Sequence, residues 1–112
     1  MIEKIVLDYL NESLGVSAFM EYPTENLESF VVVEKTGSRK VNHVNYATIA
    51  VQSIAKSLES AAILNEEVKE TMESIVALDS IGSIALNSDY NFTNAQTKQY
   101  RYQSVFDLVF VE

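Results

Sequence analysis

Apolar residues near the start of the chain recur at the spacing of an amphipathic helix. They share one side of a helical wheel and comprise Ile2, Ile5, Val6, Tyr9, Leu10 and Leu14. This pattern predicts an N-terminal helix of about four turns. Gly15 follows directly, so we expect it to end the helix in the left-handed conformation that glycine adopts readily.

The next part of the chain carries β patterns. Residues 18–22 favour a short strand that stops at Pro23, which has no N–H to donate to a sheet. Residues 30–35 begin Phe-Val-Val-Val, apolar on both faces, as in a central strand that is covered on each side. Residues 36–40 resemble a turn, and residues 44–52 show a weak strand-like alternation between two faces. We therefore expect a long antiparallel hairpin with an extended tip that begins at residue 36.

From about residue 53 the apolar period changes to that of a helix. The predicted helix spans about five to six turns, and Ser57 is a plausible N-cap with Ser60 as a rival. Residues 81–90 return to a strand pattern, with Ile84, Leu86 and Tyr90 expected on one side. Residues 91–98 are polar and turn-rich, and residues 99–111 form a long, two-faced strand pattern.

The predicted order is therefore α-β-β-β-α-β-β. It indicates an α+β fold with a mainly antiparallel sheet and two helices packed on one face. No repeat, low-complexity tract or Pro/Gly linker divides the sequence, so residues 1–112 are expected to form a single domain.

The amino-acid composition limits the kinds of partner that we expect the protein to bind. Eight Lys and Arg against sixteen Asp and Glu give a formal charge of -8, which argues against general attraction to nucleic acid phosphates or to anionic membranes. Apolar residues make up 47% of the chain, too many for a disordered acidic tail. The start lacks the pattern of a signal peptide, and no apolar run is long enough to span a membrane.

The residue types that carry catalysis are scarce. Without cysteine there is no thiolate metal site, disulfide or cysteine nucleophile, and the single histidine, His43, favours solvated surface over a general base. Three isolated glycines cannot build a phosphate-binding loop. Glu66 and Glu70, one helical turn apart, admit a hard cation, but a solvated helix face is favoured. We expect no enzyme activity, cofactor or metal, and no small-molecule substrate.

Two groups of residues are candidates for a subunit or partner interface. Lys35, Arg39 and Lys40 are three of the eight basic residues and fall in one hairpin of an acidic chain. They either keep an exposed β edge soluble or form a basic docking arm that meets the acidic surface of the next subunit. Tyr100, Arg101 and Tyr102 are types enriched in interfaces, although ordinary β propensity is the favoured explanation for the tyrosines.

Several segments, in order and over nearly the whole chain, resemble the tail terminator, or tail completion, proteins of long-tailed bacteriophages. After the N-terminal helix they run Phe19-Met-Glu-Tyr-Pro23, Phe30-Val-Val-Val-Glu-Lys-Thr-Gly37, Ala47-Thr-Ile-Ala-Val-Gln-Ser-Ile-Ala-Lys-Ser57 and, especially, Tyr100-Arg-Tyr-Gln-Ser-Val-Phe-Asp-Leu-Val-Phe110. In phage and prophage genomes such proteins are often described as minor capsid or head–tail joining proteins.

The resemblance implies a structural virion assembly protein without enzymatic activity. Its subunits would form a homo-oligomeric ring, commonly a hexameric ring, that caps the tail tube and docks to the head connector. Its partners would be other copies of itself, the tail tube protein and the connector or stopper protein, with DNA only as passing cargo. The protein would be assembled in the bacterial host cytoplasm and reside at the head–tail junction of the virion.

Two alternatives remain open from the sequence. Another head–tail joining protein, a stopper or an adaptor, would share the size and the partners of a terminator. A small ligand-binding or regulatory α+β module is the alternative of a different class, although such modules usually show a glycine-containing loop at the ligand, which this chain lacks.

Overall fold

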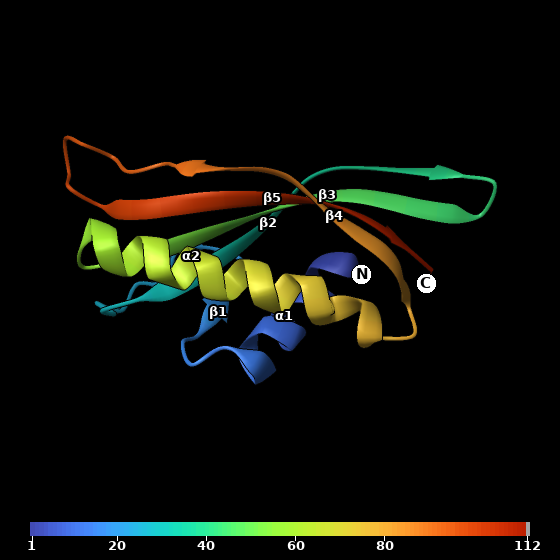
Figure 1. The fold of residues 1–112 in the computed structure, drawn as a ribbon, viewed down its shortest axis with the longest axis horizontal. Helices are drawn as coiled ribbons and strands as arrows, with labels where there is room; N and C mark the ends of the chain where they lie inside the picture. The colour runs from blue at the N-terminus through green and yellow to red at the C-terminus, as the bar shows by residue number, and fades with distance from the viewer. Residues whose placement is uncertain (112) are drawn as a thin grey trace.

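The computed structural model describes residues 1–111 and contains two helices against a five-stranded sheet (Figure 1). The elements, in chain order, are α1 (Ile2–Ser13), β1 (Ala18–Phe19), β2 (Phe30–Val41), β3 (Val44–Ala55), α2 (Leu58–Glu73), a short 3-10 turn (Ser74–Ala77), β4 (Ile81–Asn91) and β5 (Tyr100–Phe110). The strand order is β1-β2-β3-β5-β4, with only β1 and β2 parallel. The predicted α+β class, the mainly antiparallel sheet and the packing of the helices on it are confirmed.

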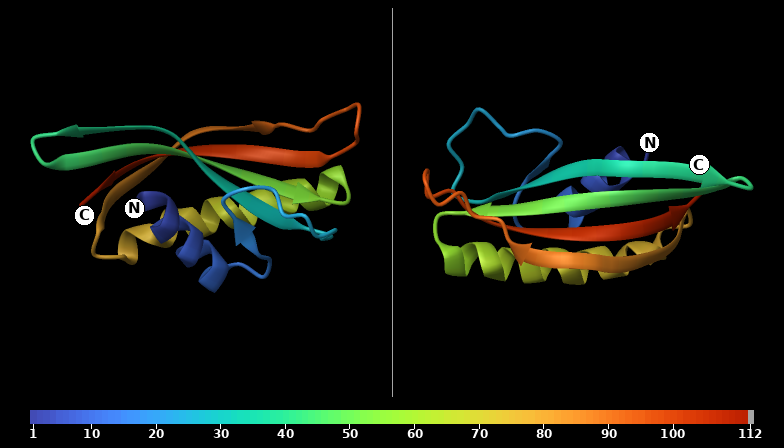
Figure 2. Two further views of the ribbon diagram at one scale, coloured as in Figure 1. Left: turned by 180° about the vertical axis from the view of Figure 1, so that it is seen from behind. Right: turned by 90° about the horizontal axis from the view of Figure 1, so that it is seen from above.

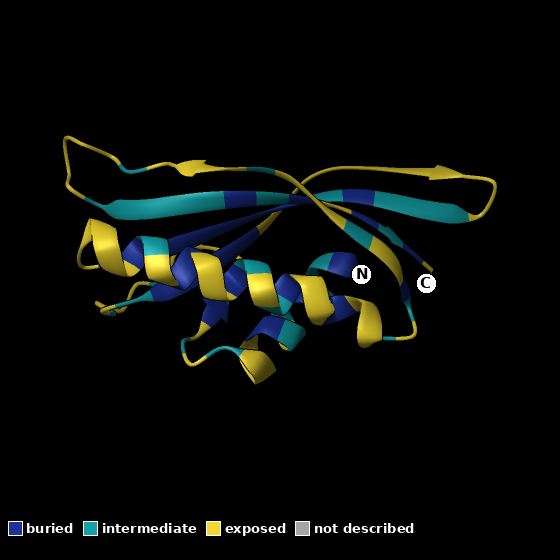
Figure 3. Ribbon diagram, in the orientation of Figure 1, coloured by how far each residue is buried: buried dark blue, intermediate teal, exposed yellow. Residues whose placement is uncertain are grey.

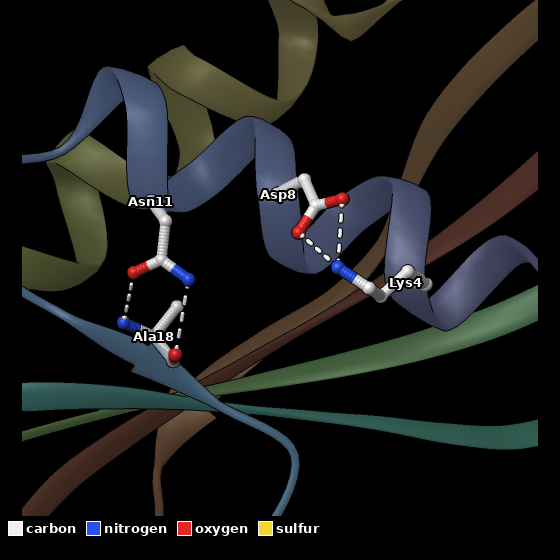
Figure 4. Close-up of polar contacts among 4 residues, drawn as sticks. All are labelled: Lys4, Asp8, Asn11 and Ala18. Carbon is white, nitrogen blue, oxygen red and sulfur yellow. Dashed lines mark hydrogen bonds and ion pairs between the residues drawn. The ribbon is translucent and has the colours of Figure 1, made fainter.

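Helix α1 is shorter than its apolar pattern predicted. Ile2, Val6 and Leu10 are buried along one side, and the helix ends at Ser13. The expected role of Gly15 is wrong, because no glycine has a positive φ. The end is held instead by Asn11, whose side-chain amide donates to the carbonyl of Ala18 at 3.2 Å and accepts from its N–H at 2.8 Å (Figure 4).

These two hydrogen bonds tie the last turn of α1 to β1. Lys4 and Asp8, one turn apart on the same helix, form an exposed ion pair at 2.7 Å (Figure 4). Such a pair contributes little because both side chains are solvated. The position of α1 therefore depends on its buried apolar side and on Asn11.

The β2–β3 hairpin differs from the predicted turn at residues 36–40. Strand β2 runs through those residues, and the chain turns at Asn42 and His43, between the paired residues Val41 and Val44. Asn42 and His43 have φ values of 49° and 66°, the backbone of a type I′ turn, which suits the twist of antiparallel strands. The turn-like residues instead produce a register shift between Lys35 and Gly37.

Helix α2 begins where the capping pattern predicted. The Ser57 hydroxyl accepts from the N–H of Ser60 at 3.1 Å, so Ser57 rather than Ser60 is the N-cap. Strand β3 extends to Ala55, further than expected, because it stays paired with β2 as far as Ile54 and with β5 as far as Ala55.

Both helices cover the same face of the sheet, as Figure 2 shows from behind and from above. The core joins α1, α2 and every second residue of the central strands; its sheet members include Val31, Val33, Ile49, Val51, Phe106 and Leu108. We call this the helix face. The opposite, outer face carries a small second cluster of Phe30, Val32 and Ile54, against which Phe19 and Leu27 pack.

Candidate functional site

The three basic residues of β2 do not share one face. Lys35 lies opposite Ile49 on the helix face and pairs with Glu3 of α1 at 3.5 Å. After the register shift, Arg39 lies opposite Tyr46 on the outer face, and its guanidinium stacks 4.1 Å from the centroid of that ring. A bulge adds one residue to a strand and so exchanges the faces of everything beyond it.

Lys40 lies opposite Asn45, back on the helix face. Among residues 1–111, neither Arg39 nor Lys40 forms an ion pair with a carboxylate, whereas Lys35 does. We call residues 38–47 the hairpin arm. Figure 3 shows it as a largely exposed extension that passes beyond the ends of the two helices. The arm contains no acidic residue.

Arg101 is occupied by contacts within its own chain. Its Nε donates to the carbonyl of Phe92 at 2.6 Å, and one terminal nitrogen donates to the hydroxyl of Tyr22 and to the side chain of Gln99, each at 2.9 Å. The guanidinium also lies 4.5 Å from the centroid of the Phe92 ring, and Tyr22 in turn donates to Gln52. Arg101 thus fastens the β4–β5 connection and the segment after β1 to the outer face.

The two tyrosines beside Arg101 point the other way. Tyr100 and Tyr102 lie opposite Ala55 and Ser53 of β3, on the helix face, and are half-buried. The Tyr and Arg side chains of this group are therefore divided between two faces of the sheet.

Among the six candidate residues, Arg39 and Lys40 lie far from Tyr100, Arg101 and Tyr102. Asn45 is opposite Lys40 and Ala55 is opposite Tyr100, so the distance from Lys40 to Tyr100 can be taken from the ten-residue step along β3. At ~3.3 Å per residue, the two positions are about 33 Å apart along the strand. The molecule is 45 Å in its longest dimension, so Lys40 and Tyr100 lie towards opposite ends, while Lys35, opposite Ile49, lies between them.

A third surface, which the sequence did not indicate, is a groove between α2 and the edge strand β4. Its volume is about 350 Å³. The helix side presents Glu66, Lys69, Glu70 and Glu73, and the sheet side presents Ile84 and Leu86, with Phe106 at the base. We call this the α2–β4 groove. Leu86 is 51% exposed, which is high for a leucine on the face that elsewhere forms the core.

One wall of the groove is fixed by polar contacts to Asp89. The carboxylate of Asp89 accepts from the Asn65 amide and from the Lys69 ammonium, each at 2.6 Å, and Lys69 also pairs with Glu66 at 2.5 Å. Burial acts to raise the pKa of Asp89, but these hydrogen bonds outweigh it and hold the pKa below its usual value. The same bonds, first to Asp89 and then to Glu66, raise the pKa of Lys69.

A register shift within β4 explains why the sequence pattern does not reveal the groove. Strand β4 changes register between Leu86 and Ser88, which brings Asp89 to the helix face opposite Ser104. Tyr90, expected beside Ile84 and Leu86, instead lies opposite Gln103 on the outer face and accepts a hydrogen bond from it. Plain alternation contains no signal for this shift.

The described part of the chain was searched for clustered metal ligands and for helices that could cross a membrane. Within residues 1–111, no group of three or more histidine or acidic residues is arranged to hold a metal ion. None of the helices there is both long and apolar enough to cross a membrane.

No protein-family model matches the chain, and no curated protein matches it.

Proposed function

We propose that the protein is a structural assembly protein of a long-tailed bacteriophage or prophage, a tail terminator. Its subunits form a homo-oligomeric ring that caps the tail tube and docks to the head connector. The protein carries out no catalysis, binds no cofactor, and resides at the head–tail junction after assembly in the host cytoplasm.

The observation that carries this proposal is the hairpin arm. It projects beyond the helices and bears Arg39 and Lys40 without carboxylate partners in the described part of an acidic chain. A ring requires a heterologous contact, in which one surface of a subunit meets a different surface of the next. A projecting arm of one charge on a body of the other charge provides such a pair of surfaces.

The charge of the body also suits a conduit for DNA. Exposed carboxylates repel phosphates, so an acidic ring lets DNA pass without holding it. The exposed side of α2 carries Glu59, Glu66, Glu67, Glu70 and Glu73. The segments of the chain that resemble tail terminators point in the same direction.

The test combines assembly with binding. We expect the purified chain to form a ring-sized species in light scattering, alone or in the presence of tail tubes assembled from a phage tail tube protein. Negative-stain images are expected to show density at tube ends. A chain that stays monomeric under both conditions and leaves tube ends bare would refute the proposal. Binding to connector rings but not to tubes would assign a stopper or adaptor instead.

A further inference from the structure

We infer that the α2–β4 groove is the receiving site for the hairpin arm of a second copy of this chain. This inference rests on the proposed function, because it identifies the subunit contact from which such a ring would be built. The hairpin arm of each subunit, which is basic and has an aliphatic residue near its tip, would lie in the α2–β4 groove of its neighbour, which has acidic and apolar walls.

The arm offers a defined chemistry. Arg39 and Lys40 are exposed, and Val41, next to the turn, is 43% exposed although it is aliphatic. The turn at Asn42 and His43 fixes the direction of the tip. The arm thus presents Arg39 and the aliphatic Val41 on its outer face and Lys40 on the helix face.

The groove offers the complement. Leu86 and Ile84 provide an apolar floor, and Glu70 and Glu73 stand above it on α2. Glu70 and Glu73 form no ion pair within residues 1–111, whereas the charge of Lys69 is already engaged by Glu66 and Asp89. The available charge in the groove is therefore negative, and complementary charges favour both the encounter and its orientation.

The strand edges support the same arrangement. Strand β4 is an edge strand of the sheet. On the edge that faces away from β3, strand β2 is paired only at Val31 and Val32, by the two-residue β1. The arm and the groove therefore lie at opposite edges of one sheet. When the arm of one copy enters the groove of the next, the open edge of β2 approaches the open edge of β4, where main-chain hydrogen bonds can continue the sheet.

Cross-linking tests the contact directly, because the chain has no cysteine of its own. Val41→Cys protein is mixed with Leu86→Cys protein under mild oxidation, and the rate of disulfide formation is measured by non-reducing gel. The matched control replaces Leu86→Cys with Ile63→Cys, on an exposed part of α2 that does not line the groove. We expect the groove pair to cross-link at least about 10-fold faster. Equal rates would overturn the inference.

Reversing the charges of the arm and of the groove provides a second test. Sedimentation velocity measures the oligomeric state of each variant. The arm variant Arg39→Glu/Lys40→Glu and the groove variant Glu70→Lys/Glu73→Lys are each expected to weaken the contact by about 10-fold or more. Mixing the two variants, or combining all four substitutions in one chain, restores charge complementarity and is expected to restore assembly. Rescue excludes simple misfolding as the cause of the loss.

Control substitutions carry single charge reversals of the same sign elsewhere. Lys56→Glu precedes α2 and Glu67→Lys lies on α2 outside the groove, and both are expected to assemble like the unmodified chain. Unaltered assembly of both test variants would overturn the inference. Failure of the ring proposal is recognised separately, since the unmodified chain would then not assemble, while the cross-linking rates still decide whether arm and groove meet.

Discussion

Lys69 of α2 and Asp89 of β4 form an ion pair, 2.6 Å between nitrogen and oxygen, that joins the helix to the edge of the sheet. The two side chains are 22% and 28% exposed, so water screens the pair only in part. The contact is also shared with Asn65 and Glu66, which makes Asp89 the centre of the polar wall of the α2–β4 groove.

Replacement Asp89→Asn is expected to lower the free energy of unfolding by about 1–2 kcal/mol at neutral pH. Because the folded-state pKa of Asp89 is lowered, its contribution is complete above the ordinary value of 3.8 and is lost as the pH falls through the folded value. Because the pKa of Lys69 is raised, its contribution is complete below 10.5 and is lost only as the pH rises through the higher folded value.

The difference between the unmodified chain and the Asp89→Asn variant is therefore expected to be flat from about pH 5 to 9 and to shrink below about pH 4. Urea denaturation at a series of pH values measures it. Asp8→Asn, which breaks the exposed pair with Lys4, is the control and should have little effect. A difference that grew on acidification would contradict a lowered pKa for Asp89 in the folded chain.

Arg101→Lys tests whether Arg101 is a structural residue of the single chain. Lysine keeps the charge but cannot reach Phe92, Tyr22 and Gln99 together, so we expect a loss of about 1–3 kcal/mol in the free energy of unfolding. Arg39→Lys is the matched control, since Arg39 also stacks on a ring but has no comparable hydrogen bonds in the described residues. An Arg101 variant with unchanged stability but impaired assembly would favour the interface explanation instead.

Leu108→Ala and Val109→Ala test the assignment of faces on β5. Leu108 is 1% exposed in the core beneath the helices, and its neighbour Val109 lies on the outer face. We expect Leu108→Ala to cost about 2–4 kcal/mol and Val109→Ala less than about 1 kcal/mol, by thermal and urea unfolding. Equal costs would show that Leu108 and Val109 are equally buried. That result would contradict the packing of both helices on the face that carries Leu108.

His43→Gly is expected to stabilise the chain by roughly 0.5–1 kcal/mol. His43 has a φ of 66°, in the region that favours glycine, and Asn-Gly is the preferred pair for a type I′ turn. His43→Val is the opposing variant, because a β-branched side chain is strained at positive φ, and it should lower the melting temperature. If both variants melt at the same temperature, the turn is of another type.

The sequence predicted those features that depend on local pattern. The apolar spacing of residues 2–14, the cap at Ser57 and the alternation along residues 99–111 led to the helices, the last strand and the α+β class. Three register shifts, at Lys35–Gly37, Ile81–Ser83 and Leu86–Ser88, were not predicted, because an extra residue in a strand depends on how its neighbour pairs with it.

These shifts determine which charged side chains meet. The shift at Lys35–Gly37 separates Arg39 from Lys35 and brings Lys40 to the face of Lys35, and the shift at Leu86–Ser88 turns Asp89 towards α2. The six residues chosen from the sequence as interface candidates are therefore spread along the length of the sheet and divided between its two faces. The α2–β4 groove was missed for a related reason: its walls come from separate segments of the chain, and no local pattern marks their proximity.

The order of the strands has a consequence for how the chain folds. The pairings of β2 with β3 and of β4 with β5 each join consecutive strands, whereas the pairing of β3 with β5 must close across the whole of α2 and β4. Contacts between segments close in sequence form fast, and contacts between segments far apart in sequence form slowly. The two hairpins are thus expected to form early and to meet late, when Ile49 pairs with Phe106. Kinetically the chain divides at α2, although its helices and strands share one core.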